Sequence, residues 1–161
     1  MDLSYYSKKR IEKVFDKSIE KFLTDDGFYN DNVYTNKEYS YCYCDIGRSN
    51  CIDEEICGYE MWSDFNSNTI YTNNGNCFDK NVNFYNKVLL IDLLEKIKNK
   101  MIEYGLNDEE KFEVYRSYGN DHELFKHIEN DYIFPFYSNV VNCLNWLNDL
   151  DIDDEIILIA I

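Results

Sequence analysis

The sequence predicts a single domain of the α+β class, in which helices pack on one sheet. The chain has 161 residues, the length of one ordinary domain with a hydrophobic core. It is 45% hydrophobic with one proline and six glycines, which is typical of a folded chain and excludes low-complexity classes. Segments with helical periodicity are separated by short strand-like runs. We therefore expect one compact domain over residues 1–161, with about three to four helices on an antiparallel or mixed sheet of about five to six strands, in the order α-βββ-α-β-α-β.

The first half of the chain contains one predicted helix followed by a predicted meander of strands. Apolar residues at helical spacing over 4–23, with Ser4 or Ser7 as a cap and Gly27 beyond the end, predict an amphipathic helix with a solvated basic stripe. From 33 to 79, Tyr, Thr, Cys and Ile occur in short runs between glycines, which indicates an antiparallel meander. We expect its strands at 37–46, 56–63 and 68–72, with a hairpin turn at 72–75 leading into a short strand around Cys77.

The second half has the clearest helical pattern. Residues 83–104 carry a broad apolar face that ends before Gly105, and we expect this helix to be covered from two sides. Alternation over 111–118 predicts a strand, and Gly119 then begins a turn or a short helix to about Glu129. Ser138 can cap a third helix, and the apolar run 156–161 predicts a terminal strand in the core.

The net charge is the most informative property of the sequence. The chain has 31 acidic and 16 basic residues, a formal net charge of −15 and a pI near 4.4. Direct binding to a nucleic-acid backbone or an anionic membrane is therefore unfavourable. Carboxylates outnumber basic residues by seven in 38–79, and again by seven after Lys126. Two interpretations remain open: a solubility coat, and a surface that binds a basic partner.

Neither a membrane span nor a signal peptide is expected. The longest uncharged apolar runs, 88–91 and 156–161, are far shorter than the roughly 20 residues that cross a bilayer. The first residues have no apolar signal core and no cleavage site. The abundance of Asn, Ile and Tyr is typical of an AT-rich genome. We therefore expect a cytoplasmic protein of a low-GC bacterium, or of a host cell if the protein is viral.

The six cysteines raise the question of a metal site. Four of them, Cys42, Cys44, Cys51 and Cys57, are close enough in sequence to suggest zinc with four thiolate ligands. Structural zinc sites usually take ligands in close pairs on a tight turn, whereas Cys42 and Cys44 have the period of two of a strand. We therefore expect buried, reduced thiols. The zinc site and a disulfide or redox role stay as alternatives.

Catalytic motifs are not evident, and we expect neither an enzyme nor a cofactor. His122 and His127 are five residues apart, which turns their rings apart on a helix, and no nucleophile motif accompanies them. No glycine-rich phosphate loop is found. The acidic run 149–155 resembles the start of a calcium loop, but Asp154 stands where that loop needs glycine, so an exposed acidic turn is expected. Pairs of carboxylates are too numerous to indicate acid–base catalysis.

Acidic and aromatic side chains together predict a protein-binding surface. Fifteen tyrosines and two tryptophans exceed what a core of this size usually holds, and such residues anchor interfaces while carboxylates accelerate encounter with a basic protein. For each of these tyrosines, the alternative is that its side chain is buried in the sheet. The candidate residues are Tyr39, Tyr41, Tyr43, Asp53, Glu54, Glu55, Tyr59, Glu60, Trp62, Asp64, Tyr71, Asp149, Asp151, Asp153, Asp154 and Glu155.

The resulting hypothesis is a small acidic inhibitor of a basic, nucleic-acid-acting enzyme. Such an inhibitor would be an immunity protein that neutralises a nuclease toxin, or a phage or viral anti-defence protein such as an anti-CRISPR. Two alternatives remain. One is a zinc-stabilised domain or enzyme that uses the cluster from Cys42 to Cys57. The other is a viral protein that recognises a host partner through apolar grooves.

Overall fold

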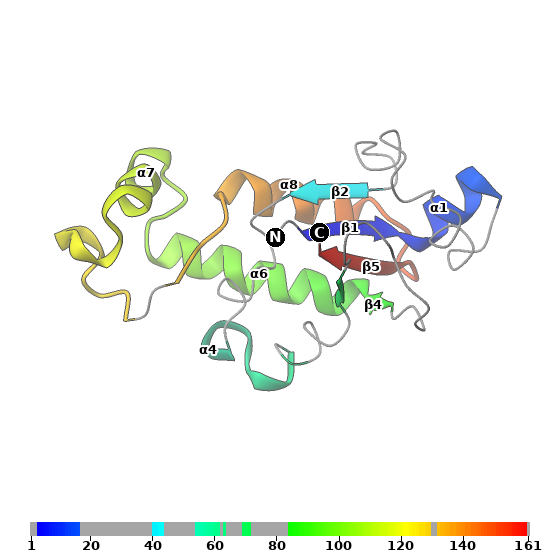
Figure 1. Ribbon diagram of the computed structural model, residues 1–161, viewed down its shortest axis with the longest axis horizontal. Helices are drawn as coiled ribbons and strands as arrows, with labels where there is room; N and C mark the ends of the chain where they lie inside the picture. The colour runs from blue at the N-terminus through cyan, green and yellow to red at the C-terminus, as the bar shows by residue number, and fades with distance from the viewer. Residues whose placement is uncertain are drawn as a thin grey trace.

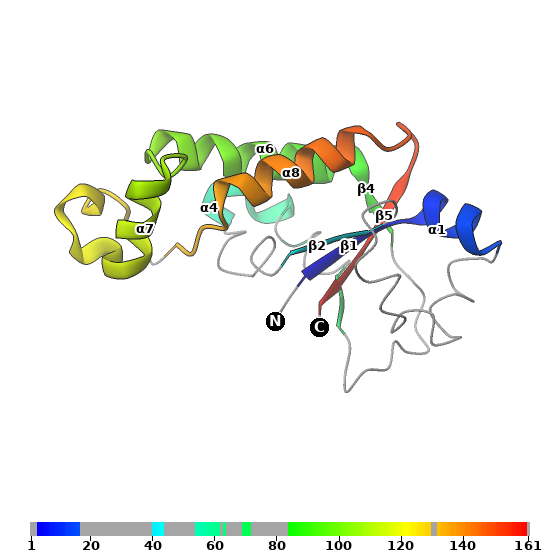
Figure 2. The same ribbon diagram turned by 90° about the horizontal axis from the view of Figure 1, so that it is seen from above.

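The structure is a computed structural model that describes residues 3–16, 40–43, 54–61, 63, 69–71, 84–129 and 132–160. These residues form a sheet, two long helices that lie side by side on one face of it, and a helical lobe at one end (Figures 1 and 2). The predicted α+β class is confirmed. In the part of the chain described, no helix is both long and apolar enough to cross a bilayer.

The sheet is built around the last strand of the chain. Strand β5 (Glu155–Ala160) pairs antiparallel with β1 (Leu3–Ser7), and β1 pairs antiparallel with β2 (Ser40–Tyr43). On its other side β5 pairs in parallel with β3 (Thr69–Tyr71), and its start pairs with the short β4 (Tyr85–Asn86). The sheet is therefore mixed, with the order β2-β1-β5-β3.

Burial on both faces explains the continuous apolar sequence of β5. Tyr5 of β1 is paired with Leu158, and both belong to the core beneath the helices. The next pair, Tyr6 and Ile157, points to the opposite face and is also buried. A central strand that is covered on both sides reads as an apolar run rather than as an alternation of apolar and polar residues.

Helices α6 (Lys87–Glu103) and α8 (Tyr137–Asn148) provide the helical layer. The buried apolar side chains of both helices follow the 3.6-residue period of an α-helix. They are Leu90, Leu93, Leu94, Ile97 and Met101 in α6, and Val140, Cys143, Leu144 and Leu147 in α8. Helix α6 is capped by the Asn86 side chain, which accepts from the Val88 N–H. It ends at Glu103, with Tyr104 as its C-cap, and the next residue, Gly105, has a φ of +72°, in the left-handed region.

A helical lobe extends from the end of α6, away from the sheet. It contains α7 (Glu109–Tyr118) and the 3₁₀ turns η2 (Gly119–Asp121) and η3 (Glu123–Phe125). Buried aromatic residues connect it to the main core: the Tyr115 ring packs edge-on against Phe125, and its hydroxyl donates to the Tyr132 carbonyl. Helix α1 (Lys8–Phe15) lies at the opposite end of the molecule (Figures 1 and 2). The lobe and α1 therefore form separate surfaces.

Several predicted elements are confirmed. The helix expected at 83–104 is α6, preceded by β4, and the helix expected near Ser138 is α8. The predicted Ser138 cap is wrong, because α8 already begins at Tyr137 and Phe136 holds the cap position without a side-chain hydrogen bond. The terminal strand is β5, and the strands expected at 37–46 and 68–72 contain β2 and β3. The turn at 72–75 and the strand around Cys77 lie outside the described residues.

The predicted order of elements is wrong in the first half of the chain. Residues 4–6, which fall within the segment 4–23 expected to be helical, belong to β1, because β2 and β5 supply partners on both of its edges. The helix begins after Ser7, which confirms the second of the two expected caps, and it ends at Phe15 rather than at 23, with Asp16 in the left-handed region. The meander is replaced by a sheet with β1 between β2 and β5. Only three antiparallel strands form its body, with β3 and β4 as additions of three and two residues, so a sheet of five to six full strands is not supported.

Two predicted strands are helical. In the 56–63 segment, α4 (Glu54–Cys57) is followed by further helical residues at 59–61. Residues 111–118 belong to α7, where Phe112 and Tyr115 are buried three positions apart and Asp108 caps the first turn. This spacing is helical, and tertiary packing selected it over the alternation. The short helix expected before Glu129 is replaced by η2 and η3.

Candidate interaction surface

The acidic run 149–155 is compensated by the basic start of α1. It forms the loop between α8 and β5, and it meets three consecutive basic residues that follow β1. The ion pairs join Lys8 to Glu155 at 3.3 Å, Lys9 to Asp151 at 3.7 Å and also to Asp153, and Arg10 to Asp149 at 3.4 Å. Each exposed pair contributes little stability, but together they cancel most of the charge of this loop.

Asp154 has a structural role within that loop. It is 4% exposed and accepts hydrogen bonds from the Ser7 hydroxyl at 2.5 Å, the Lys9 N–H at 3.2 Å and the Glu155 N–H at 2.8 Å. The Ser7 hydroxyl also accepts a hydrogen bond from the Arg10 N–H. Asp154 and Ser7 thus provide acceptors for the backbone N–H groups in the first turn of α1, which have no partner within the helix. Because it is buried, Asp154 does not present its carboxylate to a partner.

Lys9 and Asp153 alter each other's protonation. The Lys9 ammonium donates a hydrogen bond to Asp153, which lowers the pKa of that carboxyl below its ordinary value. The same hydrogen bond raises the pKa of Lys9. A second cation supports the loop from α6, where the buried Lys87 ammonium donates to the Leu150 carbonyl at 3.0 Å. The negative charge of the 149–155 loop is therefore committed mainly to contacts within the fold.

The lobe at 108–129 differs, because most of its carboxylates lack such compensation. It contains seven carboxylates and three basic side chains, a difference of four negative charges. Of these carboxylates, only Glu123 forms an ion pair within the described chain, with Lys126 at 3.3 Å. The acidic residues of α6 contrast with this, because Asp92, Glu95 and Glu103 each pair with a lysine one turn away.

Exposed apolar side chains adjoin these carboxylates. Tyr118 is 62% exposed and Leu124 is 52% exposed. His122 links them, since its ring lies 5.8 Å from the Tyr118 ring and its Nδ1 accepts from the Leu124 N–H at 3.3 Å. We call the exposed side chains of 108–129 the acidic lobe surface. It combines the two properties expected of an interface for a basic protein.

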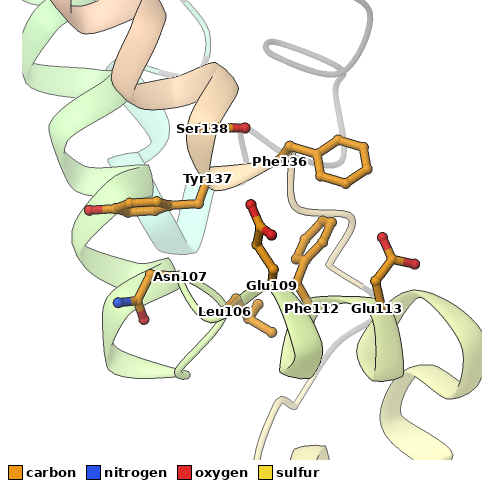
Figure 3. Close-up of a pocket in the computed structure, with 8 residues that line it drawn as sticks. All are labelled: Leu106, Asn107, Glu109, Phe112, Glu113, Phe136, Tyr137 and Ser138. Carbon is orange, nitrogen blue, oxygen red and sulfur yellow. The ribbon is translucent and has the colours of Figure 1, made fainter.

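A pocket of about 330 Å³ opens between α7 and the start of α8 (Figure 3). Glu109 and Glu113 stand one helical turn apart on α7, with the Phe112 ring between them in this view. Tyr137 and Ser138 line the opposite side at the first turn of α8. The remaining lining residues are Leu106, Asn107 and Phe136.

The residues proposed from the sequence as a binding surface occupy several parts of the fold. Two of them, Tyr59 and Glu60, follow α4 and are exposed, Tyr59 to 65%. They belong to a different part of the chain from the 149–155 loop. For five others the structure describes only the backbone: Tyr41 and Tyr43 in β2, Glu54 and Glu55 in α4, and Tyr71 in β3. Tyr39, Asp53, Trp62 and Asp64 lie outside the described residues.

The described cysteines and histidines form no metal site. Cys57 is buried, and Cys42 lies in β2, while Cys44 and Cys51 lie outside the described residues. Among the residues that are described, no three His, Cys, Asp or Glu side chains are grouped to hold a metal ion. Cys143 is fully buried in the core, where desolvation raises the pKa of its thiol.

The acidic lobe surface was missed by the sequence reasoning, although a signal for it existed. Asp108 followed by Glu109 and Glu110 is a helix N-terminus pattern, and the Asp108 side chain accepts from the Glu110 and Lys111 N–H groups. The alternation over 111–118 favoured a strand and obscured this pattern.

Comparison with known proteins yields no matching family model, curated protein or solved structure.

Proposed function

We propose that the protein binds a basic protein and blocks the surface which that partner uses for nucleic acid. The observation that carries this proposal is the acidic lobe surface, where uncompensated carboxylates adjoin exposed Tyr118 and Leu124. A partner that binds nucleic acid presents a basic surface, and a negatively charged protein can occupy it in place of the phosphate backbone. A toxin immunity protein or an anti-defence protein would act in this way.

The arrangement of charge in the fold supports placing the interface on the lobe. Carboxylates of the 149–155 loop already face Lys8, Lys9 and Arg10, so a partner's cations would compete with these. Those of the lobe face solvent, where they can accelerate the encounter. Tyr118 adds an amphipathic ring of the type that slows dissociation at protein interfaces.

Affinity capture with the full chain tests the proposal. The immobilised protein is exposed to lysate of the source cells at low ionic strength and then eluted at about 1 M salt, where the Debye length falls to about 3 Å. We expect a basic protein to be eluted and its nucleic-acid binding or cleavage to be inhibited by the purified chain. Capture of only acidic proteins, or a basic partner whose activity is unchanged, contradicts the proposal.

Matched variants then test the position of the interface. Glu110→Gln, Asp121→Asn and Glu129→Gln together remove three exposed lobe carboxylates, none of which lines the pocket. The control removes three charges from α6: Asp92→Asn, Glu95→Gln and Glu103→Gln. We expect the lobe variant to slow association by about tenfold at low salt and the control to change it much less. Equal slowing would assign the effect to net charge rather than to the lobe.

A further inference from the structure

We infer that the pocket between α7 and α8 binds a guanidinium group, and that its ligand is an arginine side chain of the basic partner. As a statement about the partner this rests on the proposed function, whereas the pocket's affinity for guanidinium can be measured without a partner. The volume of about 330 Å³ suits a side-chain head group and lies at the lower end of the range for ligand sites.

The charge of the pocket favours a cation. Glu109 and Glu113 are exposed, and within the described residues neither carboxylate has an ion-pair or hydrogen-bond partner. Their i, i+4 spacing makes them a repulsive pair on α7, and a bound cation relieves this repulsion. The first turn of α8 contributes about half a positive charge, and Arg116 beside the pocket contributes one more. The two carboxylates still exceed these positive charges, so a phosphate or carboxylate ligand is disfavoured.

The aromatic lining favours guanidinium over ammonium. Three aromatic residues, Phe112, Phe136 and Tyr137, line the pocket, and the Phe112 and Phe136 rings pack against each other with their centroids 4.9 Å apart. A guanidinium group is planar and weakly hydrated, so it can stack on a ring while its edge donates to carboxylates, whereas an ammonium is a strongly hydrated point charge. The fold already contains this contact beside the pocket, because the Arg116 guanidinium lies over the Phe136 ring, 4.6 Å from its centroid.

A titration with small probes tests the inference on the isolated protein. Nα-acetyl-arginine amide is added while the amide and aromatic signals of Tyr137 and Phe112 are followed by NMR. Nα-acetyl-citrulline amide supplies a neutral group of the same shape, and Nα-acetyl-lysine amide supplies the ammonium. We expect saturable shifts with the arginine probe at millimolar concentration, and at least tenfold weaker binding of the other two. Equal binding of the lysine or citrulline probe overturns the inference.

Substitutions distinguish the pocket from the general charge of the lobe. The double variant Glu109→Gln with Glu113→Gln removes the paired charges from exposed positions. Relief of their repulsion offsets the loss of the Glu109 charge from the first turn of α7, and circular dichroism will verify that the helix stays folded. Glu110→Gln is the matched control, an exposed neighbour that does not line the pocket. We expect the arginine probe to bind the double variant at least tenfold more weakly and the control within twofold of the original protein. Unchanged binding to the double variant overturns the inference.

The same variants separate the pocket from the proposed function. If the arginine probe binds the pocket but no basic protein is captured, the proposed function fails and the guanidinium site stands. If a basic partner is captured and inhibited with the same affinity by the double variant and by the original chain, the proposed function stands and the pocket has no role in it. Weakening of at least tenfold by the double variant alone supports both.

Discussion

Removal of the Asp154 side chain is expected to destabilise the fold more than removal of any neighbouring acid of the 149–155 loop. In Asp154→Ala, the Ser7 hydroxyl and the Lys9 and Glu155 N–H groups lose their acceptor. Hydrogen bonds to a charged group contribute about 1.5–3 kcal/mol each, and they are not additive when they share one acceptor. Because the three bonds share this one buried carboxylate, we expect a total loss of about 3 kcal/mol in the free energy of unfolding, below the sum of three independent bonds.

Two further variants define the origin of that loss. Asp154→Asn keeps an oxygen that can accept from the two N–H groups but removes the charge, so about half of the effect is expected. Asp151→Ala is the control, because the Asp151 side chain is 75% exposed and lies 3.7 Å from the Lys9 ammonium. An exposed pair of this kind contributes about 0–1 kcal/mol.

Urea unfolding followed by circular dichroism measures these differences. With a dependence on denaturant of about 2 kcal/mol/M, a loss of about 3 kcal/mol lowers the midpoint by about 1.5 M. Asp151→Ala should lower it by less than about 0.5 M. If the midpoint of Asp154→Ala lies within about 0.3 M of that of Asp151→Ala, the Asp154 carboxylate does not hold the start of β5 to α1.

Three other expectations follow from described contacts. Because folding lowers the pKa of Asp153, the stability gained from its pairing is complete above the ordinary aspartate pKa of about 3.9 and is lost as pH falls through the lowered value. Lys9→Met should flatten this acid limb and raise the NMR-measured pKa of Asp153 toward its ordinary value, because the Lys9 hydrogen bond is the largest cause of the lowering. An unchanged pKa would contradict the pairing. The buried Cys143 thiol, whose pKa is raised, should resist alkylation in the native protein and react in urea, as peptide mass spectrometry can show. Leu147→Ala, at a fully buried position of α8, should cost about 2–5 kcal/mol in calorimetry or urea unfolding, and a loss under 1 kcal/mol would contradict tight packing there.

The sequence gives the amount of acidic charge in each segment, but it does not indicate which segment lacks ion-pair partners in the fold. Both the 149–155 loop and the lobe are acidic in sequence, so nothing local separates them. They differ in the cations that reach them: Lys8, Lys9 and Arg10 are brought to the loop by the pairing of β1 with β5. Of the three basic side chains in the lobe, only Lys126 forms an ion pair with a lobe carboxylate among the described residues, and the lobe carboxylates remain exposed.

Helices α6 and α8 and strand β5 could be predicted from the sequence alone, because the local spacing of apolar residues indicates which side chains are buried. The 3.6-residue period of Leu90, Leu94 and Ile97 and the continuous apolar run of β5 each have one compatible packing. Residues 3–7 and 111–118 carry patterns that suit either a helix or a strand. Only the presence of β2 and β5 beside the first segment, and of Phe125 against Tyr115 in the second, decided between them.

Tertiary structure alone decided which charges of this acidic chain remain available to a partner. Ser7 and Asp154 are 147 positions apart in sequence, and no local pattern relates them. Their contact exists because the first and last strands lie side by side, which brings the basic start of α1 to the acidic loop. The interaction energy of a charged group depends on the charges and solvent around it in space. The sequence therefore determined how much negative charge the protein carries, whereas the fold determined where that charge is left without a cationic partner.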